Sequence, residues 1–319
     1  MAIKDFTDLR IVFMGTPAFA VASLDALVKS GCNIVGVVTA PDKLGGRGMT
    51  LQESAVKKYA VEHQLPVLQP EKLKNAAFIH ELRAFKADLQ IVVAFRMLPE
   101  VVWNMPVMGS VNLHGSLLPK YRGAAPINWA VINGEKETGV TTFKLKHEID
   151  TGNILLQESF TIPEDDNVGI VHDRMMELGA QVLVKTVKGL ADGSIEEKPQ
   201  LIFKNSSEDQ LKHAPKIFTE TCNINFNHTT TSVHNFIRGL SPYPAAFSFL
   251  HGKKIKIFTA KKIIMTPTHE PGIVHTDEKT FLHFACKDGY ISVLDLQQEG
   301  KKRMSIQNFL RGYRFHDVK

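Results

Sequence analysis

Short apolar runs alternate with segments of helical apolar spacing along the first half of the chain. The run LRIVFMG predicts a buried strand ending at Gly15, and Thr16 and Pro17 predict the cap and the first residue of the helix that follows. That helix should end at Lys29, because Gly31 stands where a helix C-terminal cap belongs. Further strands are predicted at 33–40, 66–69, 88–95 and 111–114, and further helices at 54–63 and 76–85.

Strands that alternate with helices favour right-handed βαβ units and a parallel sheet covered on both faces. The expected fold class is therefore α/β, with a doubly wound, mostly parallel, Rossmann-like sheet. Two more strands, at 139–143 and 153–160, and a long helix from Asn167 to about Leu190 complete this part of the chain. In such sheets ligands bind beyond the carboxyl ends of the strands, so the loop that follows the strand at 111–114 should line a site.

The pattern changes after Gly193. Polar, irregular residues mark a linker, and beyond it the short runs KKIKIF, FLHFAC and ISVLDL predict strands, with one helix around 232–239. Several short strands separated by turns predict a smaller, OB-like β-barrel. We therefore divide the chain into a first domain at 1–193, a linker at 194–215 and a basic C-terminal β-barrel domain at 216–319.

The composition adds limits on location and chemistry. The chain has 319 residues, enough for two cores, and no apolar run approaches the roughly 18 residues of a membrane helix. The first ten residues, with Asp5 and Asp8, resemble neither a secretion signal nor a transit peptide, so we expect a cytoplasmic protein without a membrane partner. Cys32, Cys222 and Cys286 lie far apart without a CxxC pair, so neither a disulfide framework nor a metal site is expected.

Positive charge is concentrated in the last third of the chain. From Leu211 to Lys319 there are 16 lysine and arginine residues against 8 aspartate and glutamate residues, whereas the first 210 residues hold 22 against 25. A basic half indicates an anionic partner, and nucleic acid is the commonest large one. The alternative is a well-solvated, lysine-rich surface without a partner.

Two nucleotide-binding motifs are missing from the sequence. The turn GTPAFA supplies only Gly15 where the dinucleotide fingerprint G-x-G-x-x-G needs three glycines, and Pro17 removes an amide that would face a pyrophosphate. The chain also lacks a GxxxxGK loop followed by Ser or Thr, which would bind a nucleoside triphosphate. A nicotinamide-dependent oxidoreductase is therefore disfavoured.

The stretch VNLHGSLLPKYRGAAPI, from Val111 to Ile127, is the strongest candidate for chemistry. Asn112 and His114 are two apart on a strand, so both side chains point to one face near its carboxyl end. Asp150 follows in a turn-like Asp-Thr-Gly context, and the three residue types offer a proton acceptor, an oxyanion donor and a neutral amide. This is the composition of an acyl-transfer site without a covalent nucleophile. A purely structural role is the alternative for His114 taken alone.

A family resemblance rests on these same residues. The segment NLHGSLLPKYRGAAPI, the downstream DTG and the opening strand RIVFMGTPAFA together resemble the 10-formyltetrahydrofolate-dependent formyltransferases, and the likeness extends through the basic C-terminal domain. It implies transfer of the formyl group of 10-formyltetrahydrofolate, without a metal, to the α-amine of methionyl initiator tRNA for translation initiation. The alternative acceptor within the family is an amino sugar nucleotide or another small amine. We expect the protein to act as a monomer.

The resemblance also implies roles for individual residues. It makes Asn112, His114 and Asp150 the catalytic trio. The segment AFRMLP, Ala94–Pro99, stands where family members have a Tyr-Gly-containing segment that lines the pteridine pocket. The folate-binding residues implied are Ser116, Leu117, Leu118, Pro119 and Arg96.

Basic residues in two regions are the candidate RNA contacts. The segment TAPDKLGGRGMTL, Thr39–Leu51, resembles the family's extended loop that reaches the tRNA acceptor stem, and its lysine and arginine suit phosphates or splayed bases. In the C-terminal domain two lysines of KKIKIF alternate with isoleucines and so share one face of a strand. The tRNA-binding residues expected are Lys43, Arg47, Lys254, Lys256, Lys301, Lys302 and Arg303. A disordered surface loop and solvated surface lysines are the alternatives.

Overall fold

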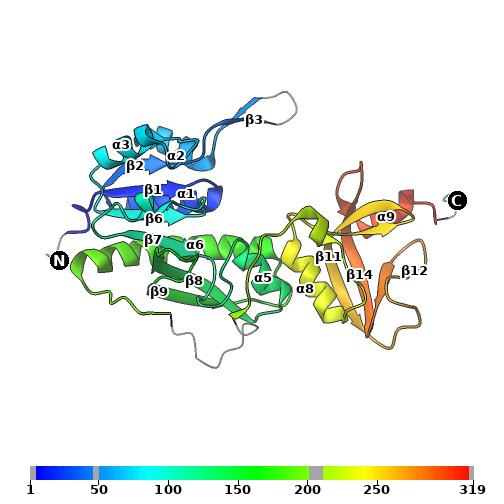
Figure 1. Cartoon of the computed structure of the whole chain (residues 1–319). Coiled ribbons are helices and arrows are strands. Elements are labelled where there is room, and N and C mark those ends of the chain that lie inside the picture. Colours follow the sequence, from blue (N-terminus) through cyan, green and yellow to red (C-terminus); the bar gives the residue numbers. More distant parts are fainter. Residues whose placement is uncertain (1–4, 46–49, 201–210, 316–319) are drawn as a thin grey trace. The chain divides into compact units, whose positions relative to one another are not determined.

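The computed structural model describes residues 5–45, 50–200 and 211–315 (Figure 1). The chain forms two compact units, each made of several stretches of sequence. The first unit comprises Met1–Gly123, Gly139–Phe160 and Asp173–His213. The second unit comprises Ala124–Thr138, Thr161–His172 and Ala214–Lys319.

A seven-stranded sheet forms the centre of the first unit, with its strands in the order β5, β2, β1, β6, β7, β8, β9. The first five strands pair in parallel, and β8 pairs antiparallel with β7. The strands are β1 (Ile11–Gly15), β2 (Ile34–Val38), β5 (Val67–Leu68), β6 (Leu89–Val93), β7 (Ser110–His114), β8 (Glu137–Lys144) and β9 (Ile154–Thr161). The predicted α/β fold with a mostly parallel, Rossmann-like sheet is confirmed.

Helices follow the strands as the apolar spacing predicts. The helices are α1 (Ala18–Lys29), α2 (Ala55–Glu62), α3 (Ala76–Ala84), α4 (Glu100–Trp103), α5 (Pro126–Ile132) and α6 (Val168–Asp192). The prediction that Thr16 caps α1 is wrong. The N-cap is Pro17, which has extended backbone and makes no side-chain cap bond, so the helix begins one residue later than expected. Gly31 has a φ of 85° and ends α1 as predicted.

The long helix predicted from Asn167 is α6, which has 25 residues. Its apolar residues Val171, Met175 and Val182 recur at helical spacing and are buried. These buried residues lie on one side of α6, so the helix is amphipathic and covers a core. Across the ranges that the structure describes, no helix combines the length and apolar character needed to cross a membrane.

Two short strands pair within the segment that was expected as an extended loop. Two short antiparallel strands, β3 (Lys43–Gly45) and β4 (Thr50–Gln52), pair so that Leu44 lies opposite Leu51. Figure 1 shows β3 extending away from the layers of the first unit. Directly opposed apolar side chains stabilise a strand pair. Leu44 and Leu51 therefore favour paired strands in a segment whose glycine-rich composition suggests only a loop.

The buried core of the first unit packs helix α3 against the central strands of the sheet. Val12 and Met14 of β1 and Val92 of β6 pack with Phe78 and Leu82 of α3, and all five side chains are buried. Because β1, β2, β6 and β7 run parallel, their carboxyl ends meet at one edge of the sheet. The last residues of β7 therefore stand where ligands bind in sheets of this kind.

The second unit contains a six-stranded sheet in the order β10, β11, β14, β13, β12, with β15 paired to β14. Every strand pair resolved in this sheet is antiparallel. The helix α8 packs on β11. The second unit also includes α5, which packs on α8. Its other elements are η1 (Thr219–Cys222), α8 (Thr230–Leu240), β10 (Ala246–Leu250), β11 (Lys253–Ile264), β12 (Val274–Thr276), β13 (Leu282–Cys286), β14 (Gly289–Gln298), β15 (Met304–Ser305) and α9 (Ile306–Gly312). The predicted smaller C-terminal β domain is confirmed.

Candidate active site

Asn112 and His114 occupy the carboxyl half of β7, as predicted. The backbone of Asn112 lies between Val92 of β6 and Phe143 of β8, which fixes its position at the centre of the sheet. Its side chain is half-buried and makes no hydrogen bond within the part of the chain that the structure describes. His114 is buried, and its ring meets Phe143 edge-on at a centroid distance of 6.4 Å. The strand thus presents an unpaired amide and a packed imidazole on one face.

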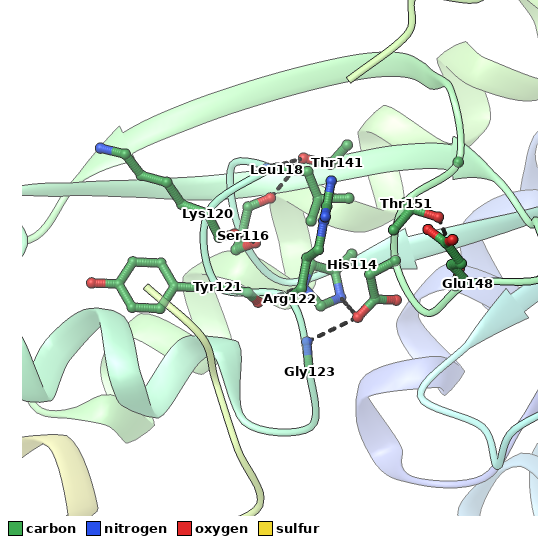
Figure 2. Close-up of polar contacts among 12 residues, drawn as sticks. His114, Ser116, Leu118, Lys120, Tyr121, Arg122, Gly123, Thr141, Glu148 and Thr151 are labelled. Atoms are coloured by element: carbon green, nitrogen blue, oxygen red, sulfur yellow. Dashed lines mark hydrogen bonds and ion pairs between the residues drawn. The ribbon is translucent and has the colours of Figure 1, made fainter. Parts of the chain in front are cut away.

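His114 and Asp150 approach each other from segments far apart in the sequence. Figure 2 shows His114 with Tyr121 and Gly123 of the loop after β7 and with Thr151 of a later loop. Nε2 of His114 lies 2.9 Å from the carbonyl oxygen of Tyr121, and because a carbonyl can only accept, Nε2 carries the proton and donates. Nδ1 faces Oδ2 of Asp150 at 3.8 Å, too far for a hydrogen bond. The backbone N–H of Gly123 donates to that same Oδ2 at 2.9 Å. The imidazole is therefore held at one nitrogen and turned toward a carboxylate with the other.

The backbone of Asp150 is held in an unusual conformation. Its φ of 56° lies in the left-handed region, which is unfavourable for a residue with a Cβ. The side-chain amide of Gln200 donates to the carbonyl oxygens of Asp150 at 2.9 Å and Gly152 at 2.8 Å. Arg122 in turn donates to Oε1 of Gln200 through Nε at 3.2 Å and Nη2 at 2.5 Å. These contacts hold the Asp-Thr-Gly turn in the conformation that aims the carboxylate at His114.

Gly152 is required by close packing of the same turn. A Cβ at this position would lie 1.6 Å from the carbonyl oxygen of Lys144, at the end of β8. No side chain fits there without moving backbone, so only glycine lets the turn lie directly against the strand. The third residue of the Asp-Thr-Gly sequence thus has a steric role that is separate from that of the carboxylate.

The loop predicted to bind folate is pinned to β8 and β9. Thr141 donates to the carbonyl of Ser116 at 2.7 Å and accepts from the backbone N–H of Leu118 at 3.1 Å. Gln157 donates to the carbonyl of Leu118 at 2.8 Å. Ser116 and Leu118 are buried, and Ser116 donates its hydroxyl to the carbonyl of Lys120, whereas Leu117 and Pro119 are half-buried. The contacts of this loop with folate stay a prediction.

Arg96 lies in the loop after β6 and is engaged by the protein itself. Its guanidinium donates to the carbonyl oxygen of Glu71 at 2.8 Å and also to that of Pro70. Partial burial lowers the pKa of Arg96 from its ordinary value. The side chain therefore ties the loop after β6 to the segment after β5, and its role in folate binding stays a prediction.

The candidate RNA contacts fall into three groups. In the first unit, Lys43 is exposed on β3, and Arg47 lies outside the described residues. On β11, Lys254 and Lys256 alternate with fully buried isoleucines, which confirms the predicted face. The ammonium of Lys254 sits 3.6 Å from the centroid of the Phe247 ring, and Lys256 donates to the carbonyl of Pro244 at 3.2 Å. Both lysine heads are held in place.

The third group follows β14 and is mixed in character. Lys301 and Lys302 are exposed at the turn. Arg303 pairs with Asp295 at 2.6 Å and lies over the ring of Phe258, so its charge is partly neutralised within the second unit. Within this group, the two lysines carry the unneutralised charge.

Several residues of the site were not found from the sequence. Gln200, Thr141 and Gln157 all hold the catalytic loops by hydrogen bonds to backbone groups. Gln200 falls inside the stretch read as a linker, and nothing in its neighbourhood signals contact with Asp150. Among the described residues, no group of three or more His, Cys, Asp or Glu side chains is arranged to hold a metal ion.

Family models match most of the chain. Residues 9–187 match the model described as formyl transferase, and residues 216–314 match the model of its C-terminal domain. The chain belongs to the formyl transferase family, as the resemblance in its sequence predicted. Over 311 residues it is 56% identical to the methionyl-tRNA formyltransferase of Bacteroides fragilis, a match that covers 96% of this chain and 95% of the relative.

Solved structures with low sequence identity share the fold. An N-formyltransferase from Helicobacter canadensis, solved with folinic acid and dTDP-3-aminofucose, has a TM-score of 0.64 at 22% identity, covering 91% of this chain and 99% of that one. HypX from Aquifex aeolicus, solved with tetrahydrofolic acid, has a TM-score of 0.64 at 18% identity and covers 98% of this chain. This chain spans 48% of the length of HypX. At sequence identities of 18% and 22%, these structures show only that the fold is shared.

Proposed function

We propose that this chain transfers the formyl group of 10-formyltetrahydrofolate to the α-amine of methionyl initiator tRNA, in the cytoplasm, as a step of translation initiation. The observation that carries the proposal is the 56% identity to a methionyl-tRNA formyltransferase, which extends over 96% of the chain. An amino sugar nucleotide is the second candidate acceptor. It is supported by a structural neighbour of only 22% identity, which was solved with dTDP-3-aminofucose.

The reaction exchanges one C–N bond for another. The neutral amine attacks the formyl carbon, a tetrahedral intermediate forms, and the bond from that carbon to N10 of the folate breaks. The amine loses one proton and N10 gains one, so no cofactor beyond the folate is consumed. Negative charge on the intermediate oxygen needs donors at about 3 Å, each typically worth roughly 2.7 to 4 kcal/mol.

His114 and Asn112 are the donors that we assign to this oxygen. Because Nε2 of His114 is committed to the carbonyl of Tyr121, Nδ1 is the nitrogen that can donate when the ring is protonated. It faces the space beside Asp150. The amide of Asn112, which has no partner among the described residues, points to the same face of β7 and can supply a second N–H.

Asp150 is assigned the proton relay. Its Oδ2 is fixed by the backbone N–H of Gly123, and that oxygen lies 3.8 Å from Nδ1 of the His114 imidazole. The same carboxylate can accept the proton of the attacking amine and return it to N10, directly or through one water. A covalent nucleophile is not needed, and the Ser116 hydroxyl is occupied by the carbonyl of Lys120.

The remaining assignments concern recognition. We assign 1–193 as the catalytic domain, 194–215 as a linker and 216–319 as the basic tRNA-binding domain of a monomer. Leu117 and Pro119, half-buried apolar residues of the loop that follows His114, are assigned to the folate. Lys43, Lys254 and Lys256 suit phosphate contacts, which position RNA without reading its sequence.

Gln200→Glu tests whether the turn geometry matters for rate. Glutamate keeps an acceptor for Arg122 but loses both N–H bonds to the carbonyls of Asp150 and Gly152. Two hydrogen bonds of about 1 kcal/mol each predict a kcat lowered by roughly tenfold to thirtyfold, with KM for tRNA unchanged. The measurement is steady-state formylation.

The matched control is Gln297→Glu. Gln297 also donates its amide to a backbone carbonyl, that of Lys301 at 2.9 Å, but it lies in the second unit. The kcat of Gln297→Glu should equal that of the wild type. A wild-type kcat in Gln200→Glu would remove Gln200 from the account of Asp150.

The acceptor is tested by comparing kcat/KM for four amines. Initiator methionyl-tRNA, elongator methionyl-tRNA, free methionine and an amino sugar nucleotide are each offered with saturating 10-formyltetrahydrofolate. The proposal predicts that the initiator tRNA is preferred by orders of magnitude. Preference for the sugar nucleotide would keep the catalytic assignments and reject the RNA acceptor.

A further inference from the structure

A charged cluster lies where the β3–β4 hairpin leaves the first unit. Lys57, in the first turn of α2, pairs with Asp42, the residue immediately before β3. The same ammonium lies 2.8 Å from Glu53, one residue after β4. One lysine therefore bridges the two ends of the hairpin.

Neutral groups complete this cluster on the side of β2 and β5. Gln69, just after β5, donates its amide to Oδ1 of Asp42 and to the carbonyl of Ala40, both at 2.8 Å. The hydroxyls of Thr39 and Ser54 share a hydrogen bond of 2.7 Å. Ser54 also caps α2 by accepting from the backbone N–H of Lys57. Both oxygens of Asp42 are thus occupied, one by the lysine and one by the glutamine.

This cluster differs from an ordinary surface ion pair. The side chains of Lys57 and Asp42 are only 18% and 17% exposed. The hydrogen bond from Lys57, and after it that from Gln69, keeps the pKa of Asp42 below its usual value, and Asp42, and after it Glu53, raise the pKa of Lys57. Lys57 and Asp42 therefore both carry their charges at neutral pH. The geometry of the cluster is fixed by ion pairs and hydrogen bonds from several segments.

The hairpin itself offers little that would fix its direction. The residues of β4 are exposed, as are Lys43 and Leu44 of β3, and the exposed fractions of Leu44 and Leu51 are 61% and 60%. A two-stranded ribbon with both faces in solvent is only marginally stable by itself. Its orientation must be set at its base, where the bridged ends meet α2 and the strand ends.

We infer that Lys57, together with Asp42 and Gln69, is a positioning residue for RNA binding, which sets the direction of the β3–β4 hairpin toward the acceptor end of the tRNA. The inference rests on the proposed function, in which Lys43 on this hairpin contacts tRNA. The ion pairs and hydrogen bonds of Lys57 described above do not include the residues assigned to folate binding or to catalysis. Replacing Lys57 should therefore change the affinity for tRNA and not the rate of formyl transfer.

The first test is Lys57→Met, which keeps the length of the side chain and removes the charge. KM and Kd for initiator methionyl-tRNA should rise about tenfold, with kcat at saturation and KM for the folate within about twofold of wild type. Lys57→Arg should recover most of the affinity. The control is Lys185→Met, which removes another lysine–carboxylate pair of the first unit, that with Glu158, and should change neither constant.

The second test separates positioning from direct contact with RNA. If Lys57 itself bound phosphate, Asp42→Asn would remove the negative charge that pairs with the Lys57 ammonium. The ammonium would then be available to RNA, and tRNA binding would tighten. Positioning predicts the opposite sign, a Kd raised severalfold, and the same direction for Gln69→Leu. Thermal unfolding of each variant reports whether the fold is kept.

The outcomes distinguish the inference from the function on which it rests. Formylation of tRNA by the wild type, combined with wild-type Kd in folded Lys57→Met and Asp42→Asn, would overturn the inference alone. Tighter binding in Asp42→Asn would also overturn it, in favour of direct contact by Lys57. A wild type that does not formylate tRNA would reject the proposed function.

Discussion

Asp150→Asn should lower the single-turnover rate of formyl transfer by about three orders of magnitude, within the range known for the loss of a general acid–base group. Asparagine retains an oxygen that can accept from the backbone N–H of Gly123, and the bonds from Gln200 reach the backbone, so the turn should keep its shape. What is lost is the negative charge beside His114 and the ability to carry a proton. Affinity for tRNA should stay at its wild-type value.

Glu148→Gln is the matched control for this variant. Glu148 lies on the same loop but is exposed, and its backbone carbonyl accepts the hydroxyl of Thr151 at 3.0 Å. Neutralising it should leave the rate within about threefold, as expected of a solvated charge. The single-turnover rate constant is measured by rapidly mixing a preformed complex of enzyme and 10-formyltetrahydrofolate with a limiting amount of methionyl-tRNA. An Asp150→Asn rate within tenfold of wild type, with tRNA still bound, would remove the proton relay from the mechanism.

Asn112→Ala should lower the same rate constant by about a hundredfold, the lower end of the effect of losing one oxyanion donor. The side chain makes no hydrogen bond within the described part of the chain, so its removal leaves no structural group unpaired. The midpoint of thermal unfolding should therefore stay close to that of the wild type. A large loss of rate without a loss of stability is the signature of an interaction made only in the transition state.

His114→Ala gives the comparison for this prediction. It removes the second proposed donor, with a loss of rate that should be at least as large, but it also removes the buried hydrogen bond from His114 to the carbonyl of Tyr121. Its stability should therefore fall, unlike that of Asn112→Ala. A wild-type rate in Asn112→Ala would show that the amide takes no part in stabilising the oxyanion.

The sheet and the position of the site follow from local sequence patterns. Buried runs such as IVVAF and helical apolar spacing predict parallel strands, and the rule that ligands bind at their carboxyl ends directs attention to Asn112 and His114. The strand β7 places both residues as the two-residue period predicts. These inferences succeed because each depends on residues that are close together in the sequence.

The support of the site depends on tertiary contacts and could not be read in this way. Gln200 reaches Asp150 across 50 positions, from a stretch whose composition indicates only a linker. Arg96 is tied to carbonyls 25 and 26 positions earlier, which a search for ligand contacts does not anticipate. The pairing of β3 with β4 was not predicted, because strands of three residues each are too short for their apolar pattern to show that Leu44 lies opposite Leu51. Apolar spacing predicts helices and strands, whereas the conformation of turns such as that at Asp150 depends on hydrogen bonds from residues distant in the sequence.

The most direct measurement follows the formyl group itself. Enzyme loaded with radiolabelled 10-formyltetrahydrofolate is mixed with initiator methionyl-tRNA, and the amino acid is released from the tRNA and identified. The account predicts that the label is recovered as N-formylmethionine, one per tRNA charged, with unlabelled tetrahydrofolate as the other product. Label that stays on the folate, or that leaves as free formate without reaching the α-nitrogen of methionine, would contradict the proposed reaction.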